Sequence, residues 1–320
     1  MKGKVLVTGS TGFIGRDLVR RIAAAGYRVR AAGRGVPEGI AGPGIEACTL
    51  PDLKEIHWRP LLSGITHVVH LAGIAHAEAQ ISEETYMQIN AHSVQRLAEA
   101  ARAANVKRVI LMSSIRAQTG PVARGAVREI DEPHPTDAYG RSKLAAERAL
   151  AALLNGSATE WVALRPALVY GPGVKGNMRS LFKLARTGLP LPLGRLNNLR
   201  SVVSLANLAS GTVHVLESPE CAGGTYLIAD AQPVSVAEMV SDLRRGLGRQ
   251  PRLVPVPAAP IGLAARLMGK RGVWERLTGD LVADTTALRE TGWRPVETTR
   301  EALAAAIRED GHHDDLRVRS

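Results

Sequence analysis

The sequence predicts an α/β protein whose main domain is a doubly wound parallel sheet, followed by a smaller, mixed C-terminal domain. Short apolar runs alternate with amphipathic stretches through the first half of the chain, which is the pattern of repeated strand–helix units. After Arg165 this alternation breaks, and Gly and Pro become frequent. At 320 residues the chain is also longer than one ordinary domain needs.

Five short apolar segments in the first half are expected to be strands, several of them rich in β-branched residues. These segments are Lys4–Val7, Arg28–Ala32, Thr66–His70, Arg108–Met112 and Trp161–Leu164. Helices are expected where apolar residues recur at helical spacing. These stretches are Phe13–Ala25, Glu83–Ala104 and Asp137–Leu154. Repeated strand–helix units of this kind give a parallel sheet with helices on both of its faces.

The second half is expected to divide between the two domains. Residues 171–200 are rich in Gly and Pro, which predicts a loop-dominated insertion. The later elements are a strand at Thr225–Ala229, helices at Ser235–Leu247 and Thr299–Arg308, and a polar tail at 311–320 that is expected to be disordered. The predicted main domain is residues 1–168, with segments near 201–235 returning to it, and the smaller domain is residues 169–200 and 236–310.

The bulk composition argues against several classes of function. The net charge is +11 and the sequence pI is near 10.2, yet the basic residues are scattered and aromatic residues make up only 3%. A nucleic-acid partner is therefore not expected, because base stacking needs more aromatic side chains. The two cysteines, Cys48 and Cys221, lie far apart in no metal-binding spacing, so neither a disulfide framework nor a bound metal is expected.

The apolar runs all fall well short of the roughly 20 residues that a membrane-spanning helix needs, so no membrane insertion is expected. The chain starts almost directly on a strand-like segment, without the charged and apolar regions of a secretion signal. Together with the cysteine usage, this start predicts a cytoplasmic protein.

A glycine-rich segment, Thr8–Gly15 (TGSTGFIG), connects the first expected strand to the first expected helix. Gly9 permits a tight turn, Gly12 lets the backbone approach a pyrophosphate, and Gly15 lets helix and strand pack closely. The N-terminus of the helix adds N–H donors and a partial positive charge. This order of strand, glycines and helix indicates a Rossmann-type domain that binds a nicotinamide dinucleotide, and hence an oxidoreductase-type enzyme.

The end of the second expected strand bears on the choice of dinucleotide. NAD sites usually place Asp or Glu there to accept a hydrogen bond from the ribose 2′-OH, whereas NADP sites favour a nearby Arg. The chain reads RAAGR from Arg30 to Arg34, and the next acidic residue is Glu38. Arg34 is therefore the candidate ligand of a 2′-phosphate, which favours NADP and leaves NAD possible.

Tyr139 and Lys143 lie four residues apart on an expected helix and so share one face. An ammonium beside a phenol favours the phenolate, so we expect Lys143 to lower the pKa of Tyr139 from about 10 towards neutrality. Ser114 follows the strand Arg108–Met112, and the carboxyl ends of parallel strands line a ligand crevice. The three side chains therefore form a candidate acid–base site.

Five segments stand in the order found in a known group of enzymes. They are TGSTGFIG, HLAG (70–73), SSI (113–115), DAYGRSK (137–143) and RPALVYGPG (165–173). With these segments the chain resembles the extended short-chain dehydrogenase/reductase superfamily. More narrowly, it resembles the NAD-dependent epimerase/dehydratase family, whose members act on nucleotide-diphosphate sugars. The resemblance spans nearly the whole chain and implies the same fold and chemistry.

The resemblance implies a role for each catalytic candidate. Tyr139 would be the acid/base, Lys143 its electrostatic partner, and Ser114 the hydroxyl that orients the sugar oxygen. Asn90, in MQINAHSVQRLAEAA, matches a helix asparagine that implies a proton relay to the lysine, with a purely structural asparagine as the alternative. The dinucleotide contacts that it implies, beside Gly9, Gly12, Gly15, Arg34, Tyr139 and Lys143, are Thr11, Phe13, Ile14, Asp52, Leu53, Leu71, Ala72, Gly73 and Pro166.

The same resemblance implies that the substrate is a nucleotide-diphosphate sugar, expected to be UDP-linked, which Ser113, Ser114 and Tyr139 would contact. Asn177, in GVKGNM, matches the position that meets the pyrophosphate, and Arg200 matches a phosphate-binding arginine. Arg276 is a looser match and would be a further phosphate ligand. His76 would face the substrate, with a surface or packing role as the alternative. A homodimer formed through the helices Glu83–Ala104 and Asp137–Leu154 is also implied.

The residues after Ser114 bear on the reaction. Dehydratases of the resembled family place an Asp-Glu pair there, whereas this chain has Ile115 and Arg116 and no acid before Glu129. Dehydration would lack its general acid and base, so it is disfavoured. Reduction of a C4 ketone and epimerisation at C4 are the remaining reactions, and they share one hydride geometry.

Arg34 and the absence of an acid at the end of the second expected strand favour reduction, because a reductase exchanges its cofactor and commonly uses NADP. The segment 188–208, GLPLPLGRLNNLRSVVSLANL, also resembles bacterial reductases of UDP-4-keto-6-deoxy-N-acetylhexosamines, which serve surface polysaccharide synthesis. A UDP-sugar 4-epimerase with tightly bound NAD is the first alternative. A catalytically silent dinucleotide sensor or scaffold is an alternative of another class, disfavoured by the intact serine, tyrosine and lysine.

Overall fold

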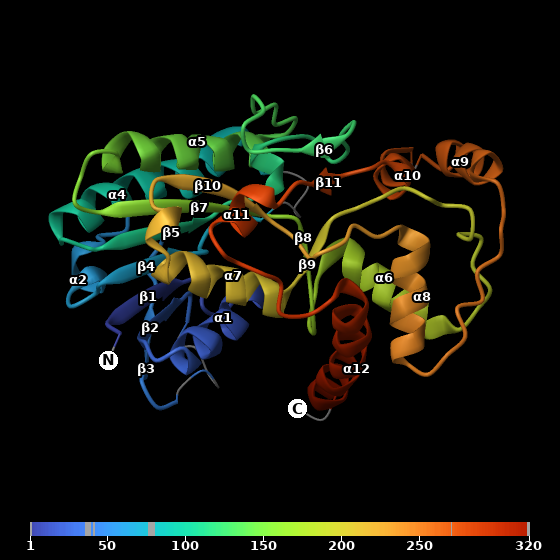
Figure 1. The fold of residues 1–320 in the computed structure, drawn as a ribbon, viewed down its shortest axis with the longest axis horizontal. Helices are drawn as coiled ribbons and strands as arrows, with labels where there is room; N and C mark the ends of the chain where they lie inside the picture. The colour runs from blue at the N-terminus through green and yellow to red at the C-terminus, as the bar shows by residue number, and fades with distance from the viewer. Residues whose placement is uncertain (1, 36–39, 41, 76–80, 270, 319–320) are drawn as a thin grey trace.

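The structure, a computed structural model, describes residues 2–35, 40, 42–75, 81–269 and 271–318. Its larger lobe is a seven-stranded sheet with helices on both faces, and a smaller, mostly helical lobe lies beyond the carboxyl ends of the strands (Figure 1). All neighbouring strands of this sheet run parallel. The α/β, Rossmann-type doubly wound sheet that the sequence predicts is therefore confirmed.

The strands of the large sheet stand in the order β10-β7-β5-β4-β1-β2-β3. Their bounds are β1 Lys4–Thr8, β2 Arg28–Gly33, β3 Ile45–Thr49, β4 His67–His70, β5 Arg108–Met112, β7 Glu160–Pro166 and β10 Gly224–Ile228. The chain adds β2 and β3 on one side of β1 and then returns to add β4 on its other side. Such a reversal opens a crevice outside the carboxyl ends of β1 and β4, where ligands bind in open α/β sheets.

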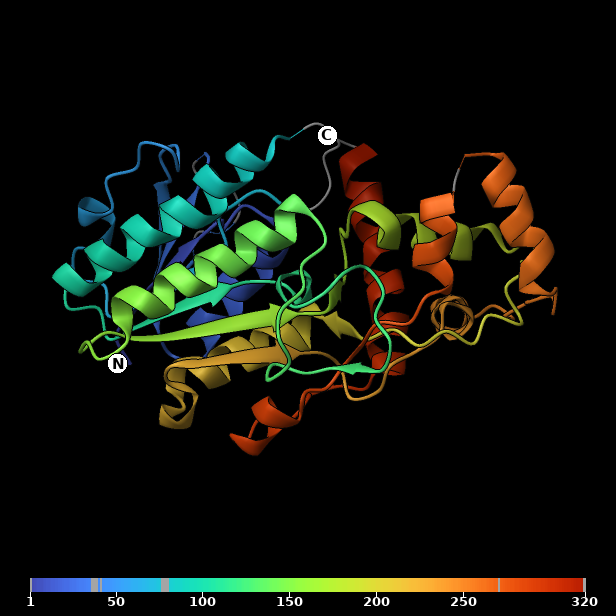
Figure 2. The same cartoon turned by 90° about the horizontal axis from the view of Figure 1, so that it is seen from above.

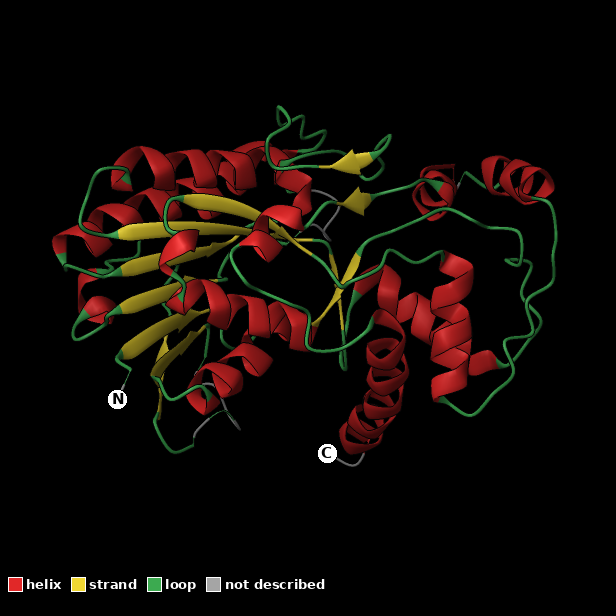
Figure 3. Ribbon diagram, viewed as in Figure 1, coloured by secondary structure: helices red, strands yellow, loops and turns green. Residues whose placement is uncertain are grey.

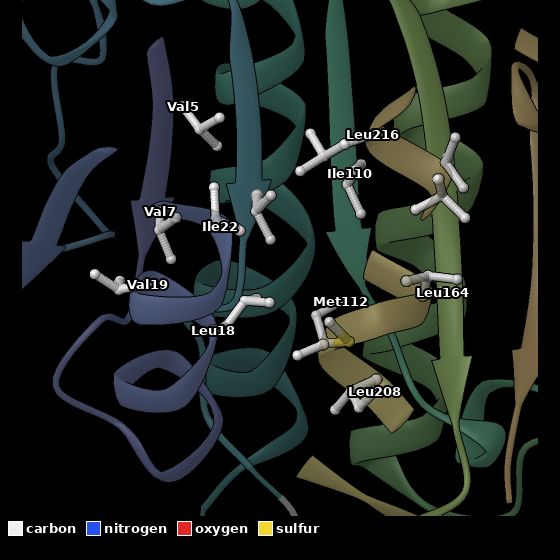
Figure 4. Close-up of a cluster of buried hydrophobic side chains, with 14 of the residues drawn as sticks. Val5, Val7, Leu18, Val19, Ile22, Ile110, Met112, Leu164, Leu208 and Leu216 are labelled. Atoms are coloured by element: carbon white, nitrogen blue, oxygen red, sulfur yellow. The ribbon is translucent and has the colours of Figure 1, made fainter. Parts of the chain in front are cut away.

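One face of the sheet is covered by three helices, α1 (Phe13–Ala24), α7 (Leu205–Glu217) and α11 (Thr286–Glu290). Leu18 and Ile22 lie one turn apart on α1 and turn their aliphatic side chains onto the strands (Figure 4). Figure 3 shows the strands of the sheet with helices on either side. The core of this face is apolar and fully buried, which fixes α1 and hence the turn that precedes it.

The opposite face is covered by α2 (Arg59–Leu62), α4 (Ser93–Ala103) and α5 (Ala138–Leu154). Seen from above, α4 and α5 lie side by side across the sheet (Figure 2). Leu97 of α4 and Leu150 of α5 are both fully buried in this second core. Ahead of α4 the chain is helical from α3 (Glu83–Tyr86) through a π-helical stretch (Met87–His92), so the predicted long helix here contains one wide turn.

The smaller lobe is built around α6 (Gly176–Thr187), α8 (Val236–Gly246) and α12 (Thr299–Val318), with α9 (Ala258–Leu267) and α10 (Arg271–Thr278) at its far end. Phe182 of α6, Met239 of α8 and Leu303 of α12 share one buried core. The loop-dominated insertion expected at 171–200 is therefore wrong for its middle part, which is the amphipathic helix α6. Its apolar residues recur at helical spacing, and the flanking Gly and Pro concealed that pattern.

The last helix, α12, continues through Val318, whereas the polar sequence predicted a disordered tail at 311–320. Once the first turns of a helix are anchored in a core, each added residue costs little, so the helix extends into polar sequence. A second difference concerns the lobe boundary. Leu288 and Trp293 pack into the core of the large sheet, so part of 236–310 returns to the main lobe.

Two small parallel ladders join the lobes: β8 (Leu168–Tyr170) with β9 (Val202–Ser204), and β6 (Ala126–Val127) with β11 (Val282–Ala283). At the first ladder the Tyr170 hydroxyl donates to Asp230 at 2.7 Å, and Asp230 also accepts from the Ser204 backbone at 3.0 Å. These buried bonds fix the entry to the smaller lobe. Among the described helices, none has the length and apolar character needed to cross a membrane.

Candidate active site

The glycine segment forms a tight turn between β1 and α1. Gly9 adopts a left-handed φ of +71°, and the Gly12 N–H donates to the Gly9 carbonyl at 3.0 Å. A Cβ at Gly15 would lie 2.2 Å from that same carbonyl oxygen, so a larger residue would push α1 off the turn. Gly12 is the N-cap of α1 and offers no capping side chain, so the helix start suits a bound anion. This cradle fits a dinucleotide pyrophosphate.

The segment after β4 lies directly against the glycine turn. The Ala72 N–H donates to the Thr8 hydroxyl at 3.2 Å, and the Leu71 N–H donates to the Thr8 carbonyl at 3.3 Å. A Cβ at Gly9 would come within 2.9 Å of the Ala72 nitrogen. The expected contacts at Leu71, Ala72 and Gly73 thus share one wall of the crevice with the turn.

Other expected dinucleotide contacts lie at the same edge of the sheet. Thr11 packs on Gly33 at the end of β2, where an added Cβ would lie 2.6 Å from its methyl group. Asp52 and Leu53 follow β3, and the backbone bond from Leu50 to Gly33 at 2.6 Å holds that loop beside β2. Their contacts with a dinucleotide stay predictions.

The remaining expected dinucleotide residues are Phe13, Ile14, Arg34 and Pro166. Phe13 and Ile14 start α1, and Pro166 is buried at the end of β7. Arg34 is exposed directly after β2, where the sequence places a 2′-phosphate ligand. Glu38 and His76 lie outside the described residues.

Ser114 and Tyr139 meet where β5 ends and α5 begins. Ser114 caps the short 3₁₀ helix Ile115–Ala117 and hydrogen-bonds to the Tyr139 side chain. Tyr139 lies in the first turn of α5, which Asp137 caps by accepting from the Gly140 N–H at 2.7 Å. The structure therefore brings the two predicted hydroxyls together at the carboxyl edge of the sheet.

The acidity of Tyr139 differs from the expectation. Burial raises the pKa of Tyr139 to about 12, while the hydrogen bond from Ser114 and the charge of Arg116 act in the opposite direction. Lys143 is buried one turn further along α5 and donates to the Met112 carbonyl at 2.9 Å. Burial lowers the pKa of Lys143 to about 8. The expected shift of the Tyr139 pKa towards neutrality is thus wrong, because burial of the phenol has the largest effect.

Asn90 lies in the π-helical stretch and is almost completely buried. Its side-chain oxygen accepts from the Ile74 N–H at 2.8 Å, and its amide donates to the Ser142 hydroxyl at 3.0 Å. Asn90 therefore clamps the segment after β4 to α5, next to Lys143. The proton relay implied for it stays a prediction.

The side chain of Ser113 has different partners from that of Ser114. Its side chain is buried and donates to Glu147, which forms an ion pair with Arg165 at 2.5 Å. Gln118 accepts from the same Arg165. Ser113 belongs to this interior network because successive residues of an extended segment point to opposite sides. The network holds the segment after β5 in place, and no sequence motif indicated it.

Two of the expected phosphate ligands, Arg200 and Arg276, lie next to each other. Arg200 donates to the carbonyls of Arg276 at 2.8 Å, Gly279 at 2.9 Å and Pro121 at 3.1 Å. The Arg276 side chain is exposed and donates to its own helix at Gly272. Arg200 therefore ties its own segment to the end of α10 and to the loop that contains Pro121.

Asn177 is exposed in the first turn of α6, at the rim of the smaller lobe. The structure places it on a helix N-terminus, which is a suitable position for contact with an anion. Its contact with a phosphate stays a prediction.

Comparison with known proteins agrees with this geometry. The model of the NAD dependent epimerase/dehydratase family matches residues 5–229. A Vibrio cholerae protein named UDP-glucose 4-epimerase is 36% identical over 310 residues, which are 95% of this chain and 94% of that protein. A Stenotrophomonas maltophilia 2-alkyl-3-oxoalkanoate reductase is 30% identical over 256 residues, 77% of this chain and 76% of its own.

Among solved structures, MoeE5 in complex with UDP-glucose and NAD superposes with a TM-score of 0.75 at 27% identity, covering 97% of this chain and 99% of that one. The same protein has also been solved with UDP-glucuronic acid and NAD. The chain therefore belongs to the NAD dependent epimerase/dehydratase family, within the extended short-chain dehydrogenases/reductases. It is an NAD-dependent enzyme of epimerase/dehydratase type.

Proposed function

We propose that this protein epimerises C4 of a UDP-linked hexose, using a nicotinamide dinucleotide held against the glycine turn. The observation that carries the proposal is the meeting of Ser114 with Tyr139 beside that turn, with Lys143 buried on the same helix. The Vibrio cholerae relative, named as a UDP-glucose 4-epimerase, supports epimerisation over other reactions of the family.

The side chains have separate tasks in this reaction. Tyr139 takes the proton of the C4 hydroxyl and returns it to the same oxygen, while Ser114 hydrogen-bonds that oxygen. Lys143 holds a positive charge beside the dinucleotide and stabilises the phenolate. When bound, the dinucleotide supplies hydride acceptance and return at C4. Asn90 keeps the segment after β4 in place against α5 throughout.

The sugar nucleotide would lie between the crevice and the smaller lobe. MoeE5 binds UDP-glucose and UDP-glucuronic acid, which supports a UDP-linked substrate here. Arg200 and Asn177 are the proposed diphosphate contacts, and Arg200 would exchange backbone carbonyls for phosphate oxygens.

The experiment that tests epimerisation is a panel of UDP-glucose, UDP-galactose and the two corresponding UDP-uronic acids, incubated with the purified protein and NAD. We expect one pair of 4-epimers to interconvert without net change in cofactor absorbance. Absence of interconversion for every pair would overturn the proposal.

A reductase that acts on a 4-keto UDP-sugar is the second candidate, favoured by one observation. Arg34 is exposed directly after β2, and the next acidic residue in the sequence is Glu38, a pattern that favours NADP over NAD. Net oxidation of NADPH with a UDP-4-keto-6-deoxy-N-acetylhexosamine would select this reaction.

The choice of dinucleotide has its own test. If Arg34 binds a 2′-phosphate, Arg34→Ala should weaken NADP binding by about tenfold or more, since hydrogen bonds to charged groups contribute about 1.5–3 kcal/mol. NAD binding should change little. Equal affinities of wild type and variant for NADP would assign this protein to NAD.

A further inference from the structure

Arg116 lies next to the two proposed catalytic hydroxyls, those of Ser114 and Tyr139. In the sequence it was notable only because dehydratases of the resembled family have acidic residues directly after the serine. Its backbone N–H donates to the Ser114 hydroxyl at 3.1 Å. Its carbonyl lies against the start of α5, where a Cβ at Gly140 would come within 2.2 Å of it. Its backbone thus fixes Ser114 on one side and the helix of Tyr139 on the other.

The Arg116 side chain adds an ion pair to this frame. Its Nη2 lies 2.5 Å from Oδ2 of Asp137, while Oδ1 of the same carboxylate caps α5 at Gly140. The guanidinium is largely buried, with 13% of the side chain exposed. Asp137 therefore connects the charge of Arg116 to the first turn of α5, which carries Tyr139.

The remaining donors of Arg116 indicate that its side chain does more than support the Asp137 cap of α5. Nε and Nη1 are buried and have no hydrogen-bond partner among the residues that the structure describes. Unused buried donors are costly, and a structural cap does not require them. Burial lowers the pKa of Arg200, and the nearby charge of Arg116 acts in the same direction. The guanidinium is therefore held near a second cation with one carboxylate as its ion-pair partner.

The groups around the Tyr139 phenol come from three elements. Ser114 and Arg116 face it from the 3₁₀ helix, Asp137 from the start of α5, and Tyr86 from α3 with ring centroids 6.1 Å apart. The charge of Arg116 lowers the pKa of Tyr139, and the charge of Asp137 raises it. Lys143, one turn along α5, is directed to the Met112 carbonyl.

We propose that Arg116, paired with Asp137, is a positioning residue that fixes the Tyr139 hydroxyl against Ser114 and supplies a positive charge beside the phenol. The proposal rests on the proposed function, since it assigns Tyr139 the role of acid/base. Arg116 would then be a second cation near Tyr139, in addition to Lys143. It follows Ser114 by two positions.

Variants of Arg116 and Asp137 should shift the turnover–pH profile in opposite directions. Arg116→Gln removes the positive charge, so the rising limb of the turnover–pH profile should move to higher pH by about one unit, the low end of the effect of one close charge. Asp137→Asn keeps a capping side chain but removes the negative charge, so the same limb should move to lower pH. Arg116→Lys should restore most of the wild-type profile.

The matched control is Arg141→Gln on the same helix. Arg141 lies two residues after Tyr139 and forms an exposed ion pair with Glu83 at 2.6 Å. Its loss should leave the pH profile unchanged. If Arg116→Gln and Asp137→Asn lower turnover equally at every pH, with no shift in either direction, their role is only structural and the proposal is overturned.

A second measurement separates this proposal from the proposed function. The ultraviolet absorbance of tyrosinate, with oxidised dinucleotide bound, can be titrated for each variant against its Tyr139→Phe counterpart. Opposite shifts for Arg116→Gln and Asp137→Asn support the proposal even if no UDP-sugar is turned over. Absence of a shift in both variants overturns it even if epimerisation is observed.

Discussion

The two walls of the active-site crevice are built in different ways. The dinucleotide wall consists of Gly9–Gly15 and Leu71–Gly73, which are turns directly attached to β1 and β4. The proposed substrate side consists of Arg116, Asp137 and Arg200, which are held by side-chain bonds between different segments of the chain. One wall is set by short backbone turns and the other by long-range side-chain bonds. We therefore expect changes to the two walls to have separable effects.

The largest effect is expected from Tyr139→Phe, which removes the acid/base and leaves the ring. Turnover should fall by about 10²–10⁴-fold, the usual contribution of a positioned general acid or base. Dinucleotide affinity, measured by calorimetry, should be nearly unchanged. A variant that retains turnover would contradict the assignment, and one that loses dinucleotide affinity would show that the phenol belongs to both walls.

Phe182→Ala tests how far the smaller lobe supports the proposed substrate side. Phe182 is fully buried in the core shared by α6, α8 and α12, so its loss should cost about 3–5 kcal/mol of unfolding free energy. The apparent KM for the sugar nucleotide should rise more than the dissociation constant of the dinucleotide. Leu97→Ala in the core beneath α4 is the comparison, and its effect on the dinucleotide should be the greater of the two.

Gly15→Ala tests the dinucleotide wall directly. Its Cβ would lie 2.2 Å from the Gly9 carbonyl, so the variant should lose about 1–3 kcal/mol of stability and most of its dinucleotide affinity. In Gly12→Ala the nearest atom is the same carbonyl at 3.1 Å, so the fold should be affected less. Thermal unfolding and dinucleotide binding of the two variants check this. Equal loss of stability would contradict a distinction between packing and pyrophosphate contact.

A change of stability with pH is expected through His70 at the end of β4. Burial and the nearby Lys143 charge lower the pKa of His70 to about 3, while its Nδ1 lies 2.9 Å from the Thr8 hydroxyl. The unfolded chain binds a proton at this histidine below pH ~6.5, whereas the folded chain stays neutral. The unfolding free energy should therefore fall as the pH drops from about 6.5 towards 3, by up to about 1.4 kcal/mol per pH unit.

His70→Gln should reduce that slope when chemical denaturation is measured across the same pH range. It should not abolish it, because burial also lowers the pKa of His67 to about 4. An unchanged slope in the variant would mean that His70 is protonated in the folded protein.

Much of the large lobe could be predicted from the sequence because its signals are local. Arg108–Met112 is a strand with the expected bounds, and α1, α5 and α8 differ from expectation by one or two residues at an end. β3 was missed because its residues alternate weakly and carry an acid at Glu46. α6 was missed because glycines and prolines flank it.

Some residues of the candidate site could likewise be predicted from the sequence, and others could not. Tyr139 and Lys143 could be singled out because they lie one turn apart on one helix, Ser114 because it follows the end of a strand, and the glycines because they lie within one turn. Ser113 was expected at the substrate and lies in the Glu147 network, since the direction of a side chain depends on packing. Arg116 gave no positive signal, because its partner Asp137 is distant in sequence.

The sequence by itself determined the parallel sheet, the glycine turn and the placing of Tyr139 and Lys143 on one helix face, because each depends on residues a few positions apart and on backbone geometry. Only the tertiary structure decided the charges around Tyr139 and the anchoring of Arg200. The pKa of a buried phenol is the balance of desolvation against the charges that neighbouring segments bring to it. That balance exists only after segments distant in the chain have packed together.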